Sequence, residues 1–234
     1  MRFAKILLIA FILTALLHLL GEWWYSSTLQ TFTKPLLLPL LAAYFLFAVR
    51  FQFSRFNTAI VIGLLFSFLG DVLLLLAADR SELFIFGLLS FLMTHFCYLF
   101  AFLSYLGAKR GYVFQNLWII LPFLVFLIGY NAFLLPGIPS ELHFPVSFYS
   151  LAIITMSVSA LNLRTLISHA AFVPLFSGAL LFVASDSILA FNKFQDKIQI
   201  PYVGFFIMLT YILGQYFIVR GAVQMNSRSF LDAQ

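Results

Sequence analysis

Two aspartates, Asp71 and Asp186, lie inside long apolar stretches of the chain that look alike. The first stretch reads GLLFSFLGDVLLLL over residues 63–76, and the second reads GALLFVASDSILAF over residues 178–191. A carboxylate is costly in a hydrocarbon environment, and ionisable residues kept there usually carry protons, ions or substrates. Two carboxyls in one such site can differ in protonation, so that one is an acid and the other a base. We therefore predict an acid–base site; the alternative is a pair of buried carboxylic acids that only bond neighbouring helices.

Other polar side chains within apolar stretches could assist such chemistry. His95 and Tyr98 lie one helical turn apart, as do Tyr211 and Gln215, so each pair shares a helical face. A lone intramembrane histidine can also be a hydrogen-bonded core residue. Lys34 precedes a proline that suits the first turn of a helix. Its ammonium could reach lipid phosphates, pair with an aspartate or bind a substrate phosphate.

The composition determines which elements must position these residues. Of 234 residues, 63% are hydrophobic and 9% are charged, which excludes a water-soluble globular protein. A helical span needs roughly 20 apolar residues, so the chain accommodates about eight spans with short connections. We predict an all-α polytopic membrane protein that forms a single integral membrane domain over residues 1–234. The predicted spans are 4–21, 35–50, 58–77, 82–106, 113–135, 145–161, 170–191 and 200–220.

The two aspartate stretches also predict how the spans are organised. Aligning Asp71 with Asp186 pairs Gly63 with Gly178. Because these residues belong to the third and seventh spans, the chain would consist of two parallel four-helix repeats. With a rise of about 1.5 Å per residue, both aspartates would lie about 20 to 24 Å from the inner side. We therefore place them at a similar depth in the outer half of the membrane.

The charge balance bears on orientation and partners. The net charge is +5. More lysines and arginines lie in the connecting segments on the side of the membrane that holds the N-terminus than in those on the opposite side. This bias predicts a multi-pass protein of the cell membrane with both termini cytoplasmic. The positive charge then indicates contact with anionic membrane lipids rather than with nucleic acid. Cys97, the sole cysteine, is expected to be a core residue. No histidines show metal-ligand spacing, so we predict neither a metal nor another cofactor.

Five short motifs occur in order along the chain. They are KPL at 34–36, FSxxGD at 66–71, HxxY at 95–98, SD at 185–186 and YxxxQ at 211–215. In these motifs, in size and in number of spans, the chain resembles the YhhN family of lysoplasmalogenases over essentially its whole length. The resemblance implies a membrane hydrolase that cleaves the vinyl ether bond of a lysoplasmalogen. The products would be a fatty aldehyde and glycerophospho-ethanolamine or -choline.

Vinyl ether hydrolysis suits two carboxyls. Protonation of the β-carbon gives an oxocarbenium ion, to which water adds, so the reaction needs an acid and a base. We expect one of Asp71 and Asp186 to be the acid and the other the base, and leave the assignment open. Both should line one cavity with Lys34 and His95, with carboxyl oxygens roughly 3 to 6 Å apart. The residues expected to bind the lysophospholipid or water are Lys34, Ser67, His95, Tyr98, Ser185, Asn192, Tyr211 and Gln215.

Two other functions fit part of the pattern. Intramembrane carboxylates in repeated halves also couple protons to transport, so the main alternative is a proton-coupled transporter of a lipid-like or small amphipathic solute. A lipid-binding or scaffold protein without turnover is the third. Discontinuous helices would favour the transporter, yet the aspartate stretches lack the central glycine or proline breaks that such helices need. The hydrolase is therefore the preferred interpretation, with headgroup preference and oligomeric state left open.

Overall fold

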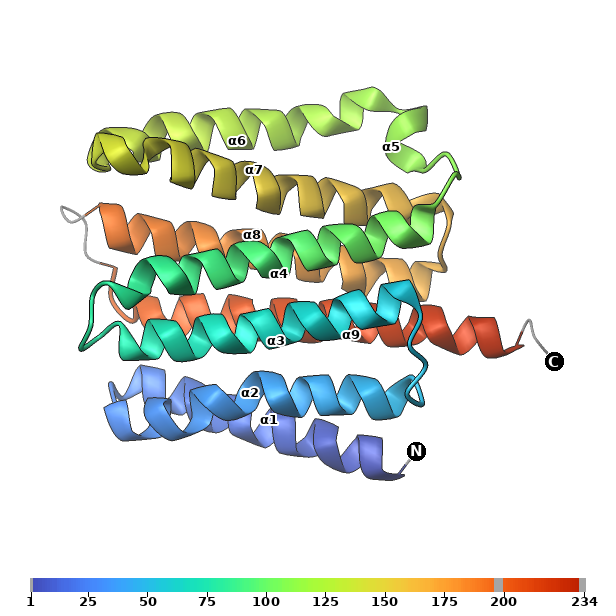
Figure 1. Ribbon diagram of the computed structural model, residues 1–234, viewed down its shortest axis with the longest axis horizontal. Coiled ribbons are helices and arrows are strands. Elements are labelled where there is room, and N and C mark those ends of the chain that lie inside the picture. Colours follow the sequence, from blue (N-terminus) through green and yellow to red (C-terminus); the bar gives the residue numbers. More distant parts are fainter. Residues whose placement is uncertain (1, 196–199, 232–234) are drawn as a thin grey trace.

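A computed structural model describes residues 2–195 and 200–231, with side chains up to residue 226. Within this part of the chain, eight helices are long and apolar enough to cross a membrane. The protein is therefore an all-α multi-pass membrane protein, as predicted. In Figure 1 the helices lie side by side, and the start of the first and the end of the last lie at the same end of the bundle. We call this the proximal end and the opposite one the distal end.

The helices follow the predicted spans with some changes in their limits. They are α1 (Arg2–Trp23), α2 (Ser27–Ala48), α3 (Arg55–Leu76), α4 (Leu83–Leu106), α5 (Tyr112–Gln115), α6 (Leu121–Leu134), α7 (Ser140–Asn162), α8 (His169–Phe194) and α9 (Val203–Leu231). A short 3-10 helix, η1 (Leu117–Ile120), joins α5 to α6. The cytoplasmic location of both termini stays a prediction. Two of the charges behind it, on Lys197 and Arg228, lie outside the described side chains.

Serine side chains set the beginnings of three of these helices. Ser26, Ser54 and Ser168 each accept a hydrogen bond from the backbone N–H three residues on, which satisfies a donor that the first helical turn leaves free. In α2 this cap, Ser26, lies nine residues before the predicted start of the span at residue 35. Pro35 is therefore inside the helix, and its predicted place in the first turn is wrong. Lys34 consequently lies within α2.

The packing agrees with the predicted parallel repeat. Helices α3 and α8 run in the same direction, from the proximal to the distal end (Figure 1), and each packs closely against the helix that follows it. Gly63 permits the first contact, because a Cβ there would collide with the ring of Tyr98 on α4. Gly178 permits the second, because a Cβ there would lie 2.6 Å from the backbone nitrogen of Ile218 on α9. The two aligned glycines thus perform the same task in the two halves.

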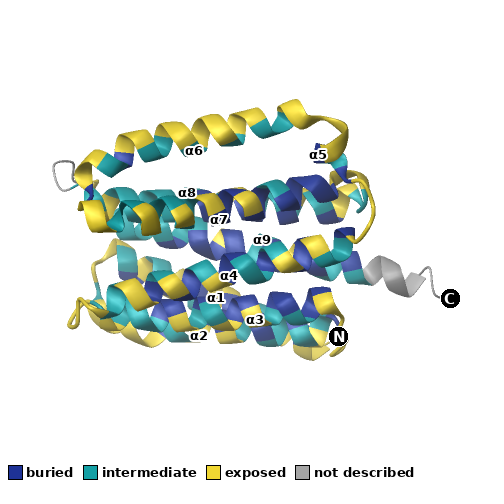
Figure 2. Ribbon diagram, turned by 45° about the horizontal axis from the view of Figure 1, so that its top comes forward, coloured by how far each residue is buried: buried dark blue, intermediate teal, exposed yellow. Residues whose placement is uncertain are grey.

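Helix α6 departs from this close packing. Of its residues only Leu134 is buried, and Figure 2 shows a ribbon that is mostly exposed, with intermediate segments between. The corresponding span of the first half, α1, buries five residues along its length. The first span of the second half is therefore packed less closely than the first span of the first half.

Candidate functional site

Asp186 is held by side chains from two other helices. It lies on α8, and its Oδ2 accepts a hydrogen bond of 2.6 Å from the hydroxyl of Tyr149 on α7. The same oxygen is 3.1 Å from Nε2 of His95 on α4. His95 is fully buried, whereas the side chain of Asp186 is 13% exposed. Both contacts use Oδ2, so neither of them occupies the other carboxyl oxygen, Oδ1. We call these three residues the Asp186 group.

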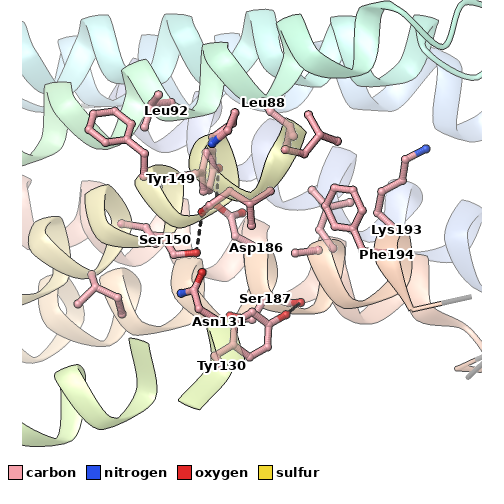
Figure 3. A pocket seen from close by; sticks show the side chains of 18 of the residues that line it. Leu88, Leu92, Tyr130, Asn131, Tyr149, Ser150, Asp186, Ser187, Lys193 and Phe194 are labelled. Carbon is pink, nitrogen blue, oxygen red and sulfur yellow. Dashed lines mark hydrogen bonds between the residues drawn. The ribbon is translucent and has the colours of Figure 1, made fainter. Parts of the chain in front are cut away.

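A cavity of about 510 Å³ reaches the Asp186 group from the distal half of the bundle. Its size is within the range of about 300–1,000 Å³ common for small-molecule sites. Helices α4, α6, α7 and α8 form its walls, and Figure 3 shows Asp186 and Tyr149 at its centre with Lys193 toward one side. Most of the wall is leucine, isoleucine, valine and phenylalanine. The polar residues that line it are Ser81, Tyr130, Asn131, Tyr149, Ser150, Asp186, Ser187 and Lys193.

Asn131 on α6 contributes a free acceptor to this cavity. Its side-chain nitrogen donates to the carbonyl of Leu127 at 2.8 Å, which defines which end of the amide carries the oxygen. That oxygen is buried and has no hydrogen-bond partner among the described residues. A buried acceptor without a partner is costly, so a water molecule or a ligand hydroxyl would stabilise this site. Asn131 and Ser150 are both labelled in Figure 3 among the side chains that line the cavity.

Asp71 belongs to a second polar group. It lies on α3, is 2% exposed, and accepts a hydrogen bond of 2.8 Å from the hydroxyl of Tyr211 on α9. Close by, Gln215 donates to Ser67 at 2.8 Å and accepts from Tyr98 at 2.6 Å. These residues, together with Thr94, which contacts Ser67, form what we call the Asp71 group. All of its side chains are buried, and their hydrogen bonds join α3, α4 and α9.

The prediction that both aspartates line one cavity is wrong. They do lie in the same half of the bundle, because each occupies the distal half of a helix that runs in the same direction. Of the described residues that line the cavity, however, only Asp186 is one of the two aspartates, and neither His95 nor Lys34 is among them. The ring of Phe182 on α8 packs against both His95 and Tyr211, with centroids 4.8 and 5.6 Å away. An apolar ring thus contacts both groups.

The other predicted residues have separate environments. Ser185 donates to the carbonyl of Ile207 at 3.0 Å and so joins α8 to α9. Asn192 is exposed and does not line the cavity. Lys34 is half-buried and interacts electrostatically with Asp71 and with Glu22 on α1. These three residues therefore lie outside the cavity in this structure.

Of the polar residues that line the cavity, sequence reasoning predicted only Asp186; Tyr149, Asn131 and Lys193 are among those that it missed. Tyr149 and Asn131 lie among apolar neighbours, and nothing in their spacing distinguishes them from packing residues. Lys193 was assigned to a connection between spans. Its position seven residues after Asp186 was nevertheless a usable signal, because residues seven apart lie two turns apart on one helical face.

The described residues contain no group of three or more histidine, cysteine, aspartate or glutamate side chains that could hold a metal ion. We expect EDTA to leave the vinyl ether hydrolysis expected from the sequence unchanged, because Asp186, His95 and Tyr149 can move protons without a metal. The assay compares initial rates before and after dialysis against the chelator. A reproducible loss that zinc restores would contradict this expectation.

The fold and the cavity together define a multi-pass helical membrane protein with a carboxyl group that lines a largely apolar cavity. Within that class the chain belongs to the YhhN family, whose pattern matches residues 29–222. It is similar to the protein named lysoplasmalogenase TMEM86A of Bos taurus, with 32% identity over 172 residues. The similarity covers 71% of this chain and 66% of that relative, slightly less than two thirds of its length. No solved structure matches the chain.

Proposed function

We propose that this protein is a lysoplasmalogenase, which hydrolyses the vinyl ether bond of a lysoplasmalogen to a fatty aldehyde and a glycerophospho-base. The observation that carries the proposal is the carboxyl of Asp186, bonded to Tyr149 and His95 and directed into an apolar cavity. Membership of the YhhN family and similarity to a protein named lysoplasmalogenase support the same reaction. The apolar wall of the cavity can bind an alkenyl chain, and the carboxyl can supply the proton that cleavage of a vinyl ether bond needs.

The first step of the proposed mechanism is a proton transfer from Asp186 to carbon. In its protonated form, Asp186 donates from Oδ1 to the β-carbon of the vinyl ether, and the electrons of the double bond form the new C–H bond. The resulting oxocarbenium ion faces the carboxylate, which stabilises the positive charge in a water-poor site. The hydroxyl of Tyr149 and Nε2 of His95 both contact Oδ2. They hold the carboxyl in place and stabilise its negative charge after the transfer.

Water addition completes the reaction. A water molecule attacks the oxocarbenium carbon and passes a proton to the carboxylate of Asp186, which returns that residue to its starting form. The free oxygen of Asn131 can accept a hydrogen bond from this water and orient it. In the collapse of the hemiacetal, Asp186 gives its proton to the glycerol oxygen as the C–O bond breaks and takes the proton of the hemiacetal hydroxyl, which releases the aldehyde and leaves Asp186 protonated. A single carboxyl thus serves first as acid and then as base.

Asp71 has a supporting role in this proposal. Its hydrogen bond to Tyr211 joins α3 to α9, and Tyr211 packs against Phe182 on α8, one turn before Asp186. The Asp71 group therefore determines where α8 lies relative to α4. This division of roles replaces the acid–base pair of two aspartates that we expected from the sequence.

A transporter is less well supported. Helices α3 and α8 continue unbroken past Asp71 and Asp186, whereas transporter sites are typically formed by discontinuous helices. Binding a proton for transport needs only a carboxyl, whereas the carboxyl of Asp186 is also hydrogen-bonded to a tyrosine and a histidine.

Purified protein incubated with three lipids tests the function. The lipids are a lysoplasmalogen, its saturated 1-alkyl ether analogue and a 1-acyl lysophospholipid, and the product measured is aldehyde. We expect aldehyde from the vinyl ether only, because a saturated ether has no double bond to protonate and an ester yields a fatty acid. Absence of aldehyde from all three lipids, with correctly folded protein, would reject the proposal and favour the transporter.

A further inference from the structure

We propose that Lys193 binds the phosphate of the lysophospholipid, and that its distance from Asp186 places the vinyl ether at the acid. This inference rests on the proposed function and adds the residue that recognises the headgroup. Lys193 is the one lysine or arginine among the described residues that line the cavity, and Asp186 is the one acidic residue among them. The site therefore has one cation for an anionic headgroup and one acid for the bond.

The spacing of the two residues matches the substrate. Seven residues of helix separate Asp186 from Lys193, which corresponds to about 10.5 Å along the axis of α8. In a lysoplasmalogen, six single bonds join the vinyl ether carbon to phosphorus, a length of about two extended residues, or roughly 7 Å. The difference between these two lengths is short enough for the Lys193 ammonium to contact a phosphate oxygen while the vinyl ether lies at Asp186. Both functional groups of the substrate can thus be engaged at once.

The surroundings of Lys193 favour this role. Its ammonium lies 4.6 Å from the centre of the Phe84 ring on α4, so the side chain extends across the space between α8 and α4. The residue is exposed and lies at the distal end of α8. A phosphate there would be at the membrane boundary, where its other oxygens and the polar base can stay hydrated. The charge would therefore not have to enter the apolar part of the cavity.

The same placement directs the alkenyl chain. With the phosphate at Lys193 and the vinyl ether at Asp186, the chain continues toward the middle of the bundle. There Val183 on α8 and Ile153 and Ile154 on α7 line the cavity. An apolar tail is stabilised by this wall and by the lipid beside α6. The headgroup and the tail thus each meet a suitable environment.

Two substrates and four variants test the assignment. The substrates are 1-alkenyl-glycerophosphoethanolamine and the phosphate-free 1-alkenylglycerol, and the quantity measured is the ratio of their kcat/KM values. In wild type we expect the phosphate substrate to be favoured by about 10- to 100-fold, the range for a hydrogen bond to a charged group. In Lys193→Gln the ratio should fall close to one through a higher KM for the phosphate substrate. Lys193→Arg should keep most of it.

Two further lysines serve as controls. Lys109→Gln removes the same charge from an exposed residue after α4, at the proximal end, and should keep the wild-type ratio. Lys34→Gln tests the residue that the sequence suggested for the phosphate. A ratio that stays at the wild-type value in Lys193→Gln, or that falls in Lys34→Gln instead, overturns the proposal. If wild type releases aldehyde from neither substrate, the proposed function fails, and that outcome is distinct from a failed headgroup assignment.

Discussion

Asp186→Asn is expected to remove aldehyde release almost completely while the protein stays folded. An amide has the same shape as the carboxyl and can still accept the hydrogen bond from Tyr149, so the packing around α8 is preserved. It cannot donate an acidic proton or receive one from water. General acid–base catalysis is typically worth about 10²- to 10⁴-fold, and the residue serves in both steps, so we expect kcat to fall by about 10³-fold or more. Steady-state assays on purified protein give kcat, and single-turnover assays show whether the chemical step is the one that slows.

Asp71→Asn is the matched comparison. Asp71 is also an intramembrane aspartate and also accepts a tyrosine hydrogen bond, but it does not line the cavity. The asparagine can keep the bond to Tyr211, so we expect at least about a tenth of the wild-type activity, a change of one factor of ten in rate. Thermal unfolding in detergent controls for folding in both variants. Equal and complete loss of activity in the two variants, with normal unfolding, would restore the two-aspartate mechanism.

Gly178→Ala is expected to have the largest effect on stability. A Cβ at this position would lie 2.6 Å from the backbone nitrogen of Ile218 and 2.7 Å from the carbonyl oxygen of Gly214 on α9. Backbone atoms cannot rotate away as a side chain can, so α8 and α9 must separate. Overpacking of this kind typically costs about 1–3 kcal/mol. We therefore expect a clearly lower unfolding temperature, and a loss of activity as α8 shifts.

Gly129→Ala provides the control for this substitution. It makes the same chemical change inside α6, where a Cβ would meet nothing within 4 Å. Alanine is favoured over glycine in a helix by up to about 1 kcal/mol, so the unfolding temperature should stay the same or rise. If the two variants unfold alike, the close contact between α8 and α9 does not contribute to stability as we infer.

The amino-acid sequence alone determined the class of protein, the number of spans and the two intramembrane aspartates. Runs of about twenty apolar residues have few alternatives to membrane helices, because the bilayer requires each backbone hydrogen bond to be made within the span. The cost of burying a carboxyl made Asp71 and Asp186 conspicuous for the same reason. Their similar depth was predicted from the helix rise and from a parallel arrangement of α3 and α8, and the structure confirms that these two helices run in the same direction.

Only the tertiary structure decided which of these residues share a site. In helices that are apolar on nearly every face, hydropathy does not define the rotation of each helix about its axis. That rotation directs His95 and Tyr149 to Asp186, and Tyr211 to Asp71. The loose position of α6 likewise follows from packing, since its sequence is as apolar as that of the buried helices. Contacts between helices, governed by small residues such as Gly178 and by rings such as Phe182, therefore placed the cavity at one aspartate and not the other.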